Sequence, residues 1–285
     1  IQRRPLGHLV DALNGLGARA ECIRGNGCPP VRVSGPLRGG VTKLRAPTSQ
    51  FLTSLLISAP LAESDIEIEV VELNEKPYVD ITLWWLDELG IKYERDGYRR
   101  FSVPGGQRYA HFRKRIPGDF STATFFAVAA AVCDTEIMLK GLDMNDTQGD
   151  KAVLGYLEKM GARIEAAPEG VRVSGGGLEG GEFDMNATPD ALPAMAVAAC
   201  FASGETRLVN VPQARMKETD RISVMAQELE KMGAVAEELE DGLVIHSEGL
   251  EGTDVRGHGD HRVVMSLAIA GMAARGETRI DTAES

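Results

Sequence analysis

The sequence predicts an α/β protein built from one unit that recurs about every 72 residues. Each unit runs helix, strand, helix and strand, with several strands per unit. Two phrases lead to this prediction. Leucine, any three residues and glycine recur from Leu13, Leu86, Leu157 and Leu229, and a short polar phrase recurs between them. Because both phrases share one period, we attribute them to an internal repeat rather than to chance.

Each copy of the first phrase ends an amphipathic helix. In the fourth copy, apolar side chains stand three or four residues apart at Ile222, Met225, Leu229 and Met232, the spacing of one helix face. A glycine then closes the phrase, at the position where helices commonly end in a left-handed residue. A short strand with alternating apolar residues follows. The four glycines are Gly17, Gly90, Gly161 and Gly233.

The second phrase places a polar residue just before each of four apolar helices. Its marker residues are 71, 71 and 70 positions apart, and three of them, Thr48, Asp119 and Asp190, are typical of helix N-caps. If the units stack around an axis, several helix N-termini face one region, where free N–H groups and helix dipoles favour a bound anion. The four markers are Thr48, Asp119, Asp190 and Asp260.

Composition and charge exclude several classes of protein. The formal net charge of −11 argues against a nucleic-acid binder, although a few well-placed basic groups can still hold a small anion. The longest apolar runs have nine residues, whereas a membrane span needs about 20, so we expect no membrane association. Cys22, Cys28, Cys133 and Cys200 form no CxxC pair, and we expect ordinary buried thiols in a reducing compartment, which indicates a cytoplasmic protein.

The densest cluster of charged residues is the stretch 215–221, just before the helix that ends at Met232. Three basic groups at a helix N-terminus oppose the helix dipole and cost stability unless an anion binds there. Lys217 and Arg221 share a face if the stretch is helical. Arginine matches a carboxylate or phosphate with its planar fork, and lysine is a point charge suited to proton transfer. The cluster therefore predicts an anion site.

Two further positions carry groups suited to catalysis. Asp190 follows Pro189 and opens an apolar helix, which makes it a candidate general base if it is partly buried. His261 places an imidazole between Asp260 and Arg262. The sequence has no HxxxH or CxxC motif, and no GxGxxG or P-loop opens a helix, so we expect neither a metal site nor a cofactor.

Taken together, these motifs resemble the enolpyruvyl transferases. The resemblance covers essentially the whole chain in order, and the strings at 217–221 and 260–262 are specific in combination. It is strongest to the branch of the family that acts on shikimate 3-phosphate. The motifs that carry it are Thr48-Ser49-Gln50-Phe51, Lys76-Pro77-Tyr78-Val79-Asp80, Gln148-Gly149-Asp150, Pro189-Asp190, residues 215–221 and Asp260-His261-Arg262.

The resemblance implies a two-lobed fold, an inside-out α/β barrel with helices inside and sheets outside. Each lobe has three units of about 72 residues, so this chain would hold four of six. Residues 1–116 would be the remainder of the first lobe and residues 117–285 the second lobe, with the basic stretch 113–115 as a linker. Segments that carry several ligand-binding cations in the family lie outside the sequence at both ends. We therefore expect these 285 residues alone to have little or no activity.

The resemblance also implies a reaction that needs no cofactor. The enolpyruvyl group of phosphoenolpyruvate would be joined to the 5-hydroxyl of shikimate 3-phosphate through a tetrahedral intermediate, with release of phosphate. Asp190 would take the hydroxyl proton with help from Lys217. Glu218, near His261, would protonate the methylene carbon of phosphoenolpyruvate.

Substrate contacts follow from the same motifs. Phosphoenolpyruvate would be bound by Arg221 and Arg262, with Gln50 between the two ligands. Shikimate 3-phosphate would be bound by Thr48, Ser49, Gln50, Tyr78, Asp190, Gln213 and Lys217. We expect these small molecules to be the only partners, and the protein to be a monomer.

Three positions depart from the family pattern. Thr48 stands where serine is usual, which preserves the hydroxyl, and Gln213 replaces asparagine with a longer amide. Glu75 stands where a phosphate-binding serine is usual. A carboxylate facing a phosphate would repel it, so either Glu75 turns away or the phosphate subsite differs.

The same residues leave two alternative functional hypotheses. The sister enzyme that transfers enolpyruvate to UDP-N-acetylglucosamine shares the repeat and the fold, but the strings at 217–221 and 260–262 favour the shikimate branch. A non-catalytic binding module is the second alternative. Such a module would not need the set Asp190, Lys217, Glu218, His261 and Arg262. Titration with shikimate 3-phosphate would distinguish the shikimate enzyme from its sister enzyme and from a binding module.

Overall fold

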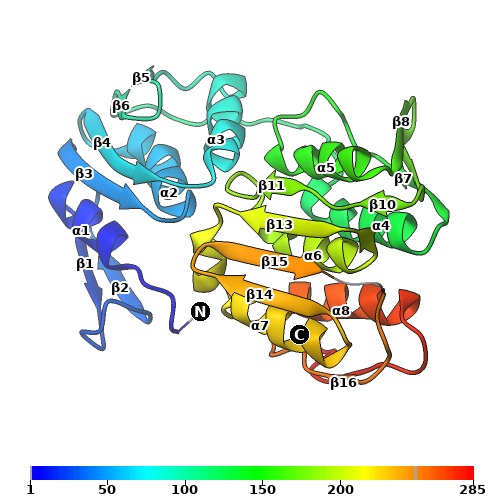
Figure 1. The fold of residues 1–285 in the computed structure, drawn as a ribbon. Coiled ribbons are helices and arrows are strands. Elements are labelled where there is room, and N and C mark those ends of the chain that lie inside the picture. The colour runs from blue at the N-terminus through cyan, green and yellow to red at the C-terminus, as the bar shows by residue number, and fades with distance from the viewer. Residues whose placement is uncertain (1, 247–248) are drawn as a thin grey trace. The chain divides into compact units, whose positions relative to one another are not determined.

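A computed structural model describes residues 2–246 and 249–285 of the chain (Figure 1). The chain divides into two compact units, Ile1–Arg115 and Ile116–Ser285. Both mix helices with sheets, as the sequence predicts. Each unit has its own hydrophobic core.

The first unit contains a four-stranded sheet in the order β3-β4-β6-β5 and a separate antiparallel pair, β1-β2. Strands β3 and β4 are parallel and joined through α2, whereas β4, β6 and β5 pair antiparallel. Core side chains such as Leu44, Phe51 and Phe101 pack between sheet and helices. The elements are α1 (Gly7–Gly15), β1 (Arg19–Cys22), β2 (Val31–Ser34), β3 (Gly40–Ala46), α2 (Gln50–Ser58), η1 (Ala59–Leu61), β4 (Ile66–Leu73), α3 (Lys76–Glu88), β5 (Glu94–Asp96) and β6 (Arg100–Val103).

The second unit begins with α4 (Phe120–Val132) and a three-stranded antiparallel sheet in the order β7-β9-β8. A four-stranded sheet follows, in the order β11-β13-β15-β14. The remaining elements are β7 (Glu136–Lys140), η2 (Gly149–Lys151), α5 (Ala152–Met160), β8 (Arg163–Ala167), β9 (Gly170–Ser174), β10 (Leu178–Glu179), β11 (Glu182–Asp184), η3 (Pro189–Ala191), α6 (Leu192–Cys200), β12 (Ala202–Ser203), β13 (Glu205–Val209), η4 (Pro212–Met216), α7 (Arg221–Lys231), β14 (Val235–Leu239), β15 (Gly242–His246), β16 (Asp254–Val255), α8 (His261–Ala273) and β17 (Arg279–Ile280).

The two four-stranded sheets share one topology. In each, a parallel strand pair joined through a helix is followed by a second helix and an antiparallel hairpin, which gives β3-β4-β6-β5 in one unit and β11-β13-β15-β14 in the other. The repeat is therefore strand, helix, strand, helix, strand, strand. The sequence predicts helix, strand, helix and strand with several strands in each unit, and the additional strand lies in the antiparallel hairpins β5-β6 and β14-β15.

The two helices of a repeat differ in burial because their surroundings differ. All nine residues of α6 are buried, since α4, α7 and α8 all pack against it. A helix that is apolar all round needs such surroundings. In contrast, α7 has an apolar face directed at the core and a charged face in solvent. The apolar helix is therefore the inner one in this unit, and its first turn lies beside those of its neighbours.

The glycines that close the first phrase behave as predicted. Gly17, Gly90, Gly161 and Gly233 all have positive φ, at 85°, 68°, 112° and 96°, and lie one or two residues after the ends of helices α1, α3, α5 and α7. Residues with a side chain rarely adopt this conformation. The prediction of four helix ends from one recurring glycine is confirmed.

The predicted N-caps are correct at one of three positions. Asp119 caps α4, since its carboxylate accepts hydrogen bonds from the amides of Ser121 and Thr122. Thr48 and Asp190 are not caps: α2 and α6 follow Ser49 and Ala191 without a side-chain cap. The fourth marker, Asp260, caps α8 through the amide of Arg262.

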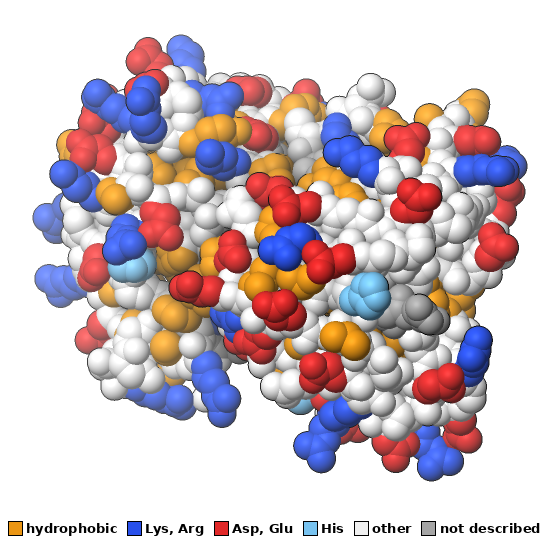
Figure 2. Space-filling model, viewed as in Figure 1, with side chains coloured by type: hydrophobic (Ala, Val, Ile, Leu, Met, Phe, Trp, Pro, Cys, Tyr) orange, Lys and Arg blue, Asp and Glu red, His pale blue; other side chains and the backbone are white. Residues whose placement is uncertain are grey.

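The cysteines are unpaired, and only Cys200 is fully buried. Burial raises the pKa of the Cys200 and Cys133 thiols. The prediction of ordinary buried thiols is therefore correct for Cys200, while Cys133 is half-buried at the end of α4 and Cys22 and Cys28 are half-buried as well. No helix among residues 2–246 and 249–285 is long and apolar enough to cross a membrane. On the face shown in Figure 2, acidic and basic side chains are interspersed rather than gathered into one basic patch.

Candidate active site

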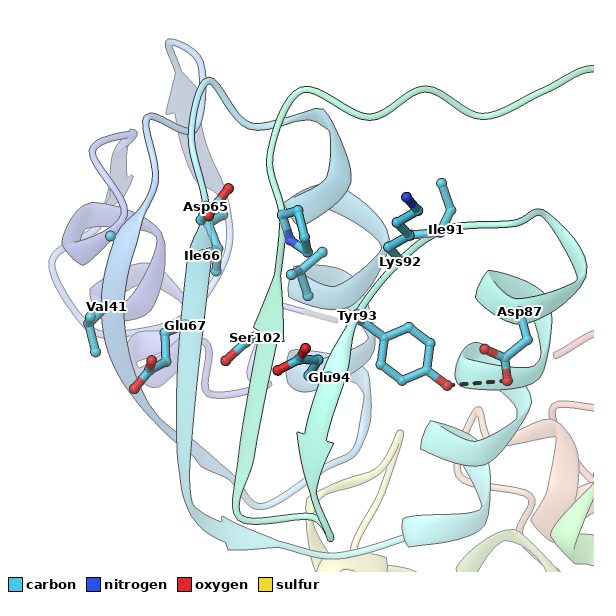
Figure 3. Close-up of a pocket in the computed structure, with 13 residues that line it drawn as sticks. Val41, Asp65, Ile66, Glu67, Asp87, Ile91, Lys92, Tyr93, Glu94 and Ser102 are labelled. Carbon is cyan, nitrogen blue, oxygen red and sulfur yellow. Dashed lines mark hydrogen bonds between the residues drawn. The ribbon is translucent and has the colours of Figure 1, made fainter.

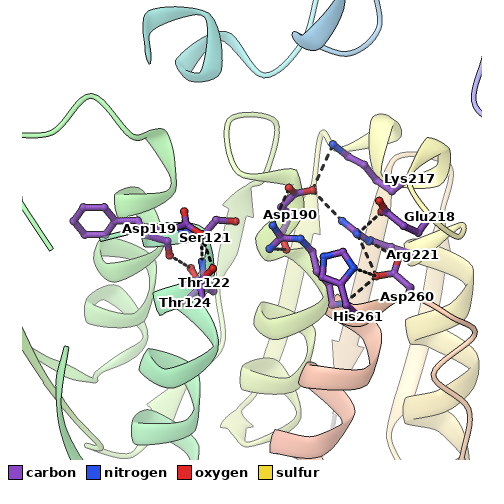
Figure 4. A network of polar contacts seen from close by, with 12 residues as sticks. Asp119, Ser121, Thr122, Thr124, Asp190, Lys217, Glu218, Arg221, Asp260 and His261 are labelled. Atoms are coloured by element: carbon purple, nitrogen blue, oxygen red, sulfur yellow. Dashed lines mark hydrogen bonds and ion pairs between the residues drawn. The ribbon is translucent and has the colours of Figure 1, made fainter. Parts of the chain in front are cut away.

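Several helices of the second unit begin close together. Figure 4 shows the first turns of α4, α6 and α8 at one end of the unit, with the segment before α7 beside them. Asp119, Asp190 and Asp260 stand at these helix starts. The repeat thus brings N–H groups and polar side chains from residues about 70 positions apart into one region.

Asp190 is the centre of this region. One carboxylate oxygen, Oδ1, lies 3.4 Å from Lys217 Nζ and accepts a hydrogen bond from Arg221 Nη1 at 2.9 Å, while Oδ2 lies 3.2 Å from Arg262 Nη2. Burial acts to raise the pKa of Asp190, but the charges of Lys217, Arg262 and Arg221 outweigh it and lower the pKa from 3.8 to about 2. Asp190 is therefore a firmly ionised carboxylate, with 22% of its side chain exposed.

Arg221 lies behind Asp190 and is almost completely enclosed, with 1% of its side chain exposed. Its Nε donates to Asp260 Oδ2 at 2.8 Å, and its Nη2 donates to Glu218 Oε2 at 2.6 Å and Asp260 Oδ1 at 3.2 Å. Burial alone would lower the pKa of Arg221, but its carboxylate partners raise it. A buried cation of this kind is tolerated only because several anions surround it.

Asp260 joins the first turn of α8 to this network. Its side chain is fully buried, and besides Arg221 it accepts hydrogen bonds from Thr219 Oγ1 and the Arg262 amide. Burial acts to raise the pKa of Asp260, and the hydrogen bonds and charge of Arg221 lower it overall. The sequence marks Asp260 as a repeat position and as part of the motif Asp260-His261-Arg262, without a role of its own. Its separation of 39 residues from Arg221 leaves no local signal of their pairing.

Lys217 and Arg221 would share a face only in a continuous helix, and the stretch between them is not helical. Residues 212–216 form the short helix η4, Lys217 follows with extended ψ of −150°, and α7 begins only at Arg221. The two side chains nevertheless meet at Asp190, because the break in the helix turns Lys217 toward it (Figure 4).

Glu218 and His261 are exposed at the same end of the unit. Glu218 is attached to the network through Arg221, and His261 Nδ1 lies 3.9 Å from Asp260 Oδ1. Gln213 is buried in η4, where its Nε2 donates to the carbonyl of Asn186 at 3.0 Å. The structure thus brings six predicted residues together: Asp190, Lys217, Glu218, Arg221, His261 and Arg262. Gln213 is buried nearby in the sequence, in η4.

The other predicted residues lie in the first unit, at the starts of α2 and α3. Ser49 is buried, Thr48 and Tyr78 are half-buried, and Gln50 is exposed as the first residue of α2. Thr48 Oγ1, Ser49 Oγ and the Ser49 amide all donate to Glu75 Oε2, at 3.0, 2.9 and 3.1 Å. Glu75 therefore does not turn away from the hydroxyls, which was one of the two possibilities left by the sequence.

A cavity of about 690 Å³ opens elsewhere in the first unit, between the sheet and the end of α3 (Figure 3). Asp65, Glu67, Asp87 and Glu94 line it, together with a single lysine, Lys92. Four carboxylates against one ammonium group give the wrong sign for a phosphate or carboxylate ligand. The volume of the cavity therefore does not make it the anion site.

Among the residues that the structure describes, no group of three or more histidine, cysteine or acidic side chains is placed to hold a metal ion. The chemistry that the second unit offers rests instead on three cations and four anionic or titratable side chains. These groups can bind an anion, orient a hydroxyl and move protons.

Comparisons with known proteins place the chain in a family. The model of the family described as EPSP synthase (3-phosphoshikimate 1-carboxyvinyltransferase) matches residues 1–285. The chain is 60% identical to the 3-phosphoshikimate 1-carboxyvinyltransferase of Acetivibrio thermocellus and 58% identical to that of Ruminiclostridium cellulolyticum; each alignment covers the whole chain and 67% or 68% of the relative.

A solved structure agrees with these sequences. The EPSP synthase of Acinetobacter baumannii matches with a TM-score of 0.80 at 28% identity, over 99% of this chain and 67% of that one. The resemblance inferred from the sequence motifs is therefore confirmed, and the chain spans about two thirds of the length of the relatives it matches.

Proposed function

Since this chain belongs to the EPSP synthase (3-phosphoshikimate 1-carboxyvinyltransferase) family, we propose that the cluster around Asp190 is its reacting centre. There the enolpyruvyl group of phosphoenolpyruvate is joined to the 5-hydroxyl of shikimate 3-phosphate. The observation that carries the proposal is one carboxylate held by Lys217, Arg221 and Arg262 where several helices begin. Such a centre combines a proton acceptor with cations for anionic substrates.

We assign the direct contacts with ligand to Lys217 and Arg262. Their side chains are 11% and 15% exposed, compared with 1% for Arg221, and each is paired with Asp190. An incoming carboxylate or phosphate can replace Asp190 as their partner, because charge-assisted hydrogen bonds to the ligand are of the same kind.

Arg221 has a different role in this proposal, although the family motif makes it a phosphoenolpyruvate ligand. Its guanidinium donates to three carboxylates and is enclosed by them. We therefore assign Arg221 as the group that positions Asp190, Glu218 and Asp260. A contact with substrate would require one of these carboxylates to give up its hydrogen bond.

The electrostatics of Asp190 support a proton transfer that depends on the substrate. With its pKa lowered to about 2, Asp190 is a weak base while its cations surround it. When anionic ligands take Lys217 and Arg262, the pKa of Asp190 rises, and the carboxylate can accept the 5-hydroxyl proton as the oxygen bonds to C2 of phosphoenolpyruvate.

The remaining steps use the exposed groups of the cluster. Glu218 is the candidate that protonates the methylene carbon, and His261 stands at the same end of the unit. The resulting tetrahedral intermediate returns a proton from its methyl group and releases phosphate, which restores the enolpyruvyl double bond on the new oxygen. No cofactor takes part.

Roles outside this cluster follow the family motif. We assign the phosphate of shikimate 3-phosphate to Thr48 and Ser49, with Tyr78 near it and Gln50 as a further ligand contact. The side-chain nitrogen of Gln213 donates to the carbonyl of Asn186. We therefore assign the side-chain oxygen of Gln213 to the contact with substrate.

The finer description of the fold is also a proposal. We propose two lobes of an inside-out α/β barrel, with residues 1–116 in the first and 117–285 in the second, and four of six repeats in this chain. The shared topology of two sheets and the inner position of α6 support it. The unpaired cysteines agree with a cytoplasmic location, and we propose a monomer.

Calorimetric titration tests this function against its alternatives. We expect the chain to bind shikimate 3-phosphate, and Lys217→Ala to weaken that binding at least about tenfold, because a charge-assisted contact is lost. Lys159→Ala, which removes an exposed lysine from α5 of the same unit, is the matched control. Binding of UDP-N-acetylglucosamine in place of shikimate 3-phosphate would contradict the proposal, as would equal effects of the two substitutions.

A further inference from the structure

Glu75 is the residue whose place in the structure the family motif does not explain. It precedes α3, but its side chain extends to the start of α2, 27 residues earlier in the sequence. There Oε2 accepts hydrogen bonds from Thr48 Oγ1, Ser49 Oγ and the Ser49 amide. Two hydroxyls and an amide that converge on one oxygen are what a phosphate oxygen requires.

This position of Glu75 is costly in two respects. The side chain is buried, with 2% of the residue exposed, although a carboxylate loses hydration on burial. Its backbone has a φ of 57°, a left-handed conformation that residues with a side chain rarely adopt. Capping of α3 does not account for these costs, because the Glu75 side chain makes no cap hydrogen bond to that helix.

We propose that Glu75 is a specificity-determining residue that occupies the phosphate subsite with its own carboxylate. This inference rests on the proposed function, which assigns the shikimate phosphate to Thr48 and Ser49. Two anions cannot share the same three donors, since the second would face the charge of the first without compensation. A phosphate therefore enters only when the Glu75 carboxylate leaves, and the affinity for phosphorylated ligands is lowered by that competition.

The competition predicts different behaviour for ligands with and without phosphate. Glu75→Ser removes the internal anion and adds a hydroxyl, so shikimate 3-phosphate should bind at least about tenfold more tightly. Unphosphorylated shikimate should bind the variant and the parent chain with affinities within about twofold of each other. Glu75→Gln still fills the subsite with an amide of the same size, so it should gain less than Glu75→Ser.

Titration calorimetry on the full chain makes this comparison, with Glu72→Gln as the matched control. Glu72 lies in the same unit, pairs with Arg45 on the exposed face of the sheet and carries the same charge. Adding Thr48→Val to Glu75→Ser should abolish most of the gain, because one of the donors is removed. The proposal is overturned if Glu75→Ser binds shikimate 3-phosphate no more tightly than the parent, or if Glu72→Gln gives the same gain.

A second measurement separates this proposal from the proposed function. If neither the parent nor any variant binds shikimate 3-phosphate, the proposed function fails, and inorganic phosphate becomes the probe of the subsite. We then expect phosphate to raise the thermal unfolding midpoint of Glu75→Ser, and of the parent by less. Equal shifts in the two chains would contradict the role of Glu75.

Discussion

Glu75 in the first unit and Asp190 in the second are both carboxylates held near the start of an inner helix of the repeat, yet their partners differ in kind. Glu75 accepts from neutral donors of Thr48 and Ser49, whereas Asp190 is surrounded by Lys217, Arg221 and Arg262. In both cases a partner lies 27 residues away in the sequence.

The difference shows how one repeat produces two kinds of site. Where the second half of the repeat supplies Lys217 and Arg221, and the next repeat supplies Arg262, the carboxylate of the first half becomes a strongly ionised group surrounded by cations. Where the second half supplies a carboxylate, the polar groups of the first half are occupied by the protein itself.

The largest effect concerns Arg221. Replacement by alanine leaves the buried Asp260 without its main partner and should lower the free energy of unfolding by about 3–5 kcal/mol. Chemical denaturation measures the change. Arg279→Ala, which breaks an exposed pair with Glu277, should cost less than about 1 kcal/mol. Similar losses of unfolding free energy in both variants would contradict the role of Arg221 as the buried cation of the cluster.

Asp190 should give the next largest effect, and its sign follows from the lowered pKa. The folded chain holds the Asp190 proton less tightly than the unfolded chain, so the stabilisation is complete above about pH 4 and is lost as the pH falls toward 2. Asp190→Asn should therefore be less stable than the parent by about 2 kcal/mol at pH 7. The two chains should converge near pH 2. A constant difference between pH 7 and pH 2 would contradict the lowered pKa.

The hydrogen bond between Ser49 and Glu75 should contribute less free energy than the ion pairs of Asp190. In a double-mutant cycle, Ser49→Ala and Glu75→Gln should interact by about 1–2 kcal/mol, since each removes one side of the same buried hydrogen bond. Denaturation of the parent, the two single variants and the double variant measures this energy. Strictly additive losses would mean that the carboxylate does not depend on the serine.

Asp119 gives the smallest effect and serves as the baseline for both sites. It occupies the equivalent position in the repeat between them, but it only caps α4. Asp119→Ala should cost about 1 kcal/mol, and Asp119→Asn should retain most of that stability because asparagine is also a good cap. If the alanine variant destabilised the chain as much as Asp190→Asn, the distinction between a cap and a reacting group would fail.

The sequence predicts this fold best where the cause of the structure is local. The glycines at 17, 90, 161 and 233 end helices because a left-handed residue is needed there, and the need can be recognised in a few residues. Asp119 is a correct cap for the same reason, since its partners are two and three positions away.

Predictions fail where a distant partner competes with a local one. Thr48 and Asp190 look like caps, but Glu75 and Lys217 engage them from the other half of the repeat. Lys217 would share a helix face with Arg221 only if the stretch were helical, and the short helix η4 ends just before Lys217. The burial of Arg221 depends on Asp260, 39 residues away, which no spacing rule identifies.

The most direct test of the account is the pKa of the Asp190 carboxyl group, measured by carbon NMR on the labelled chain with and without saturating phosphoenolpyruvate. Asp190→Asn identifies the resonance. We predict a pKa of about 2 in the free chain and a clear rise with the ligand bound, because Lys217 and Arg262 exchange Asp190 for the incoming anion. A pKa that stays at its free value while phosphoenolpyruvate is bound would contradict the assignment of these cations to the substrate.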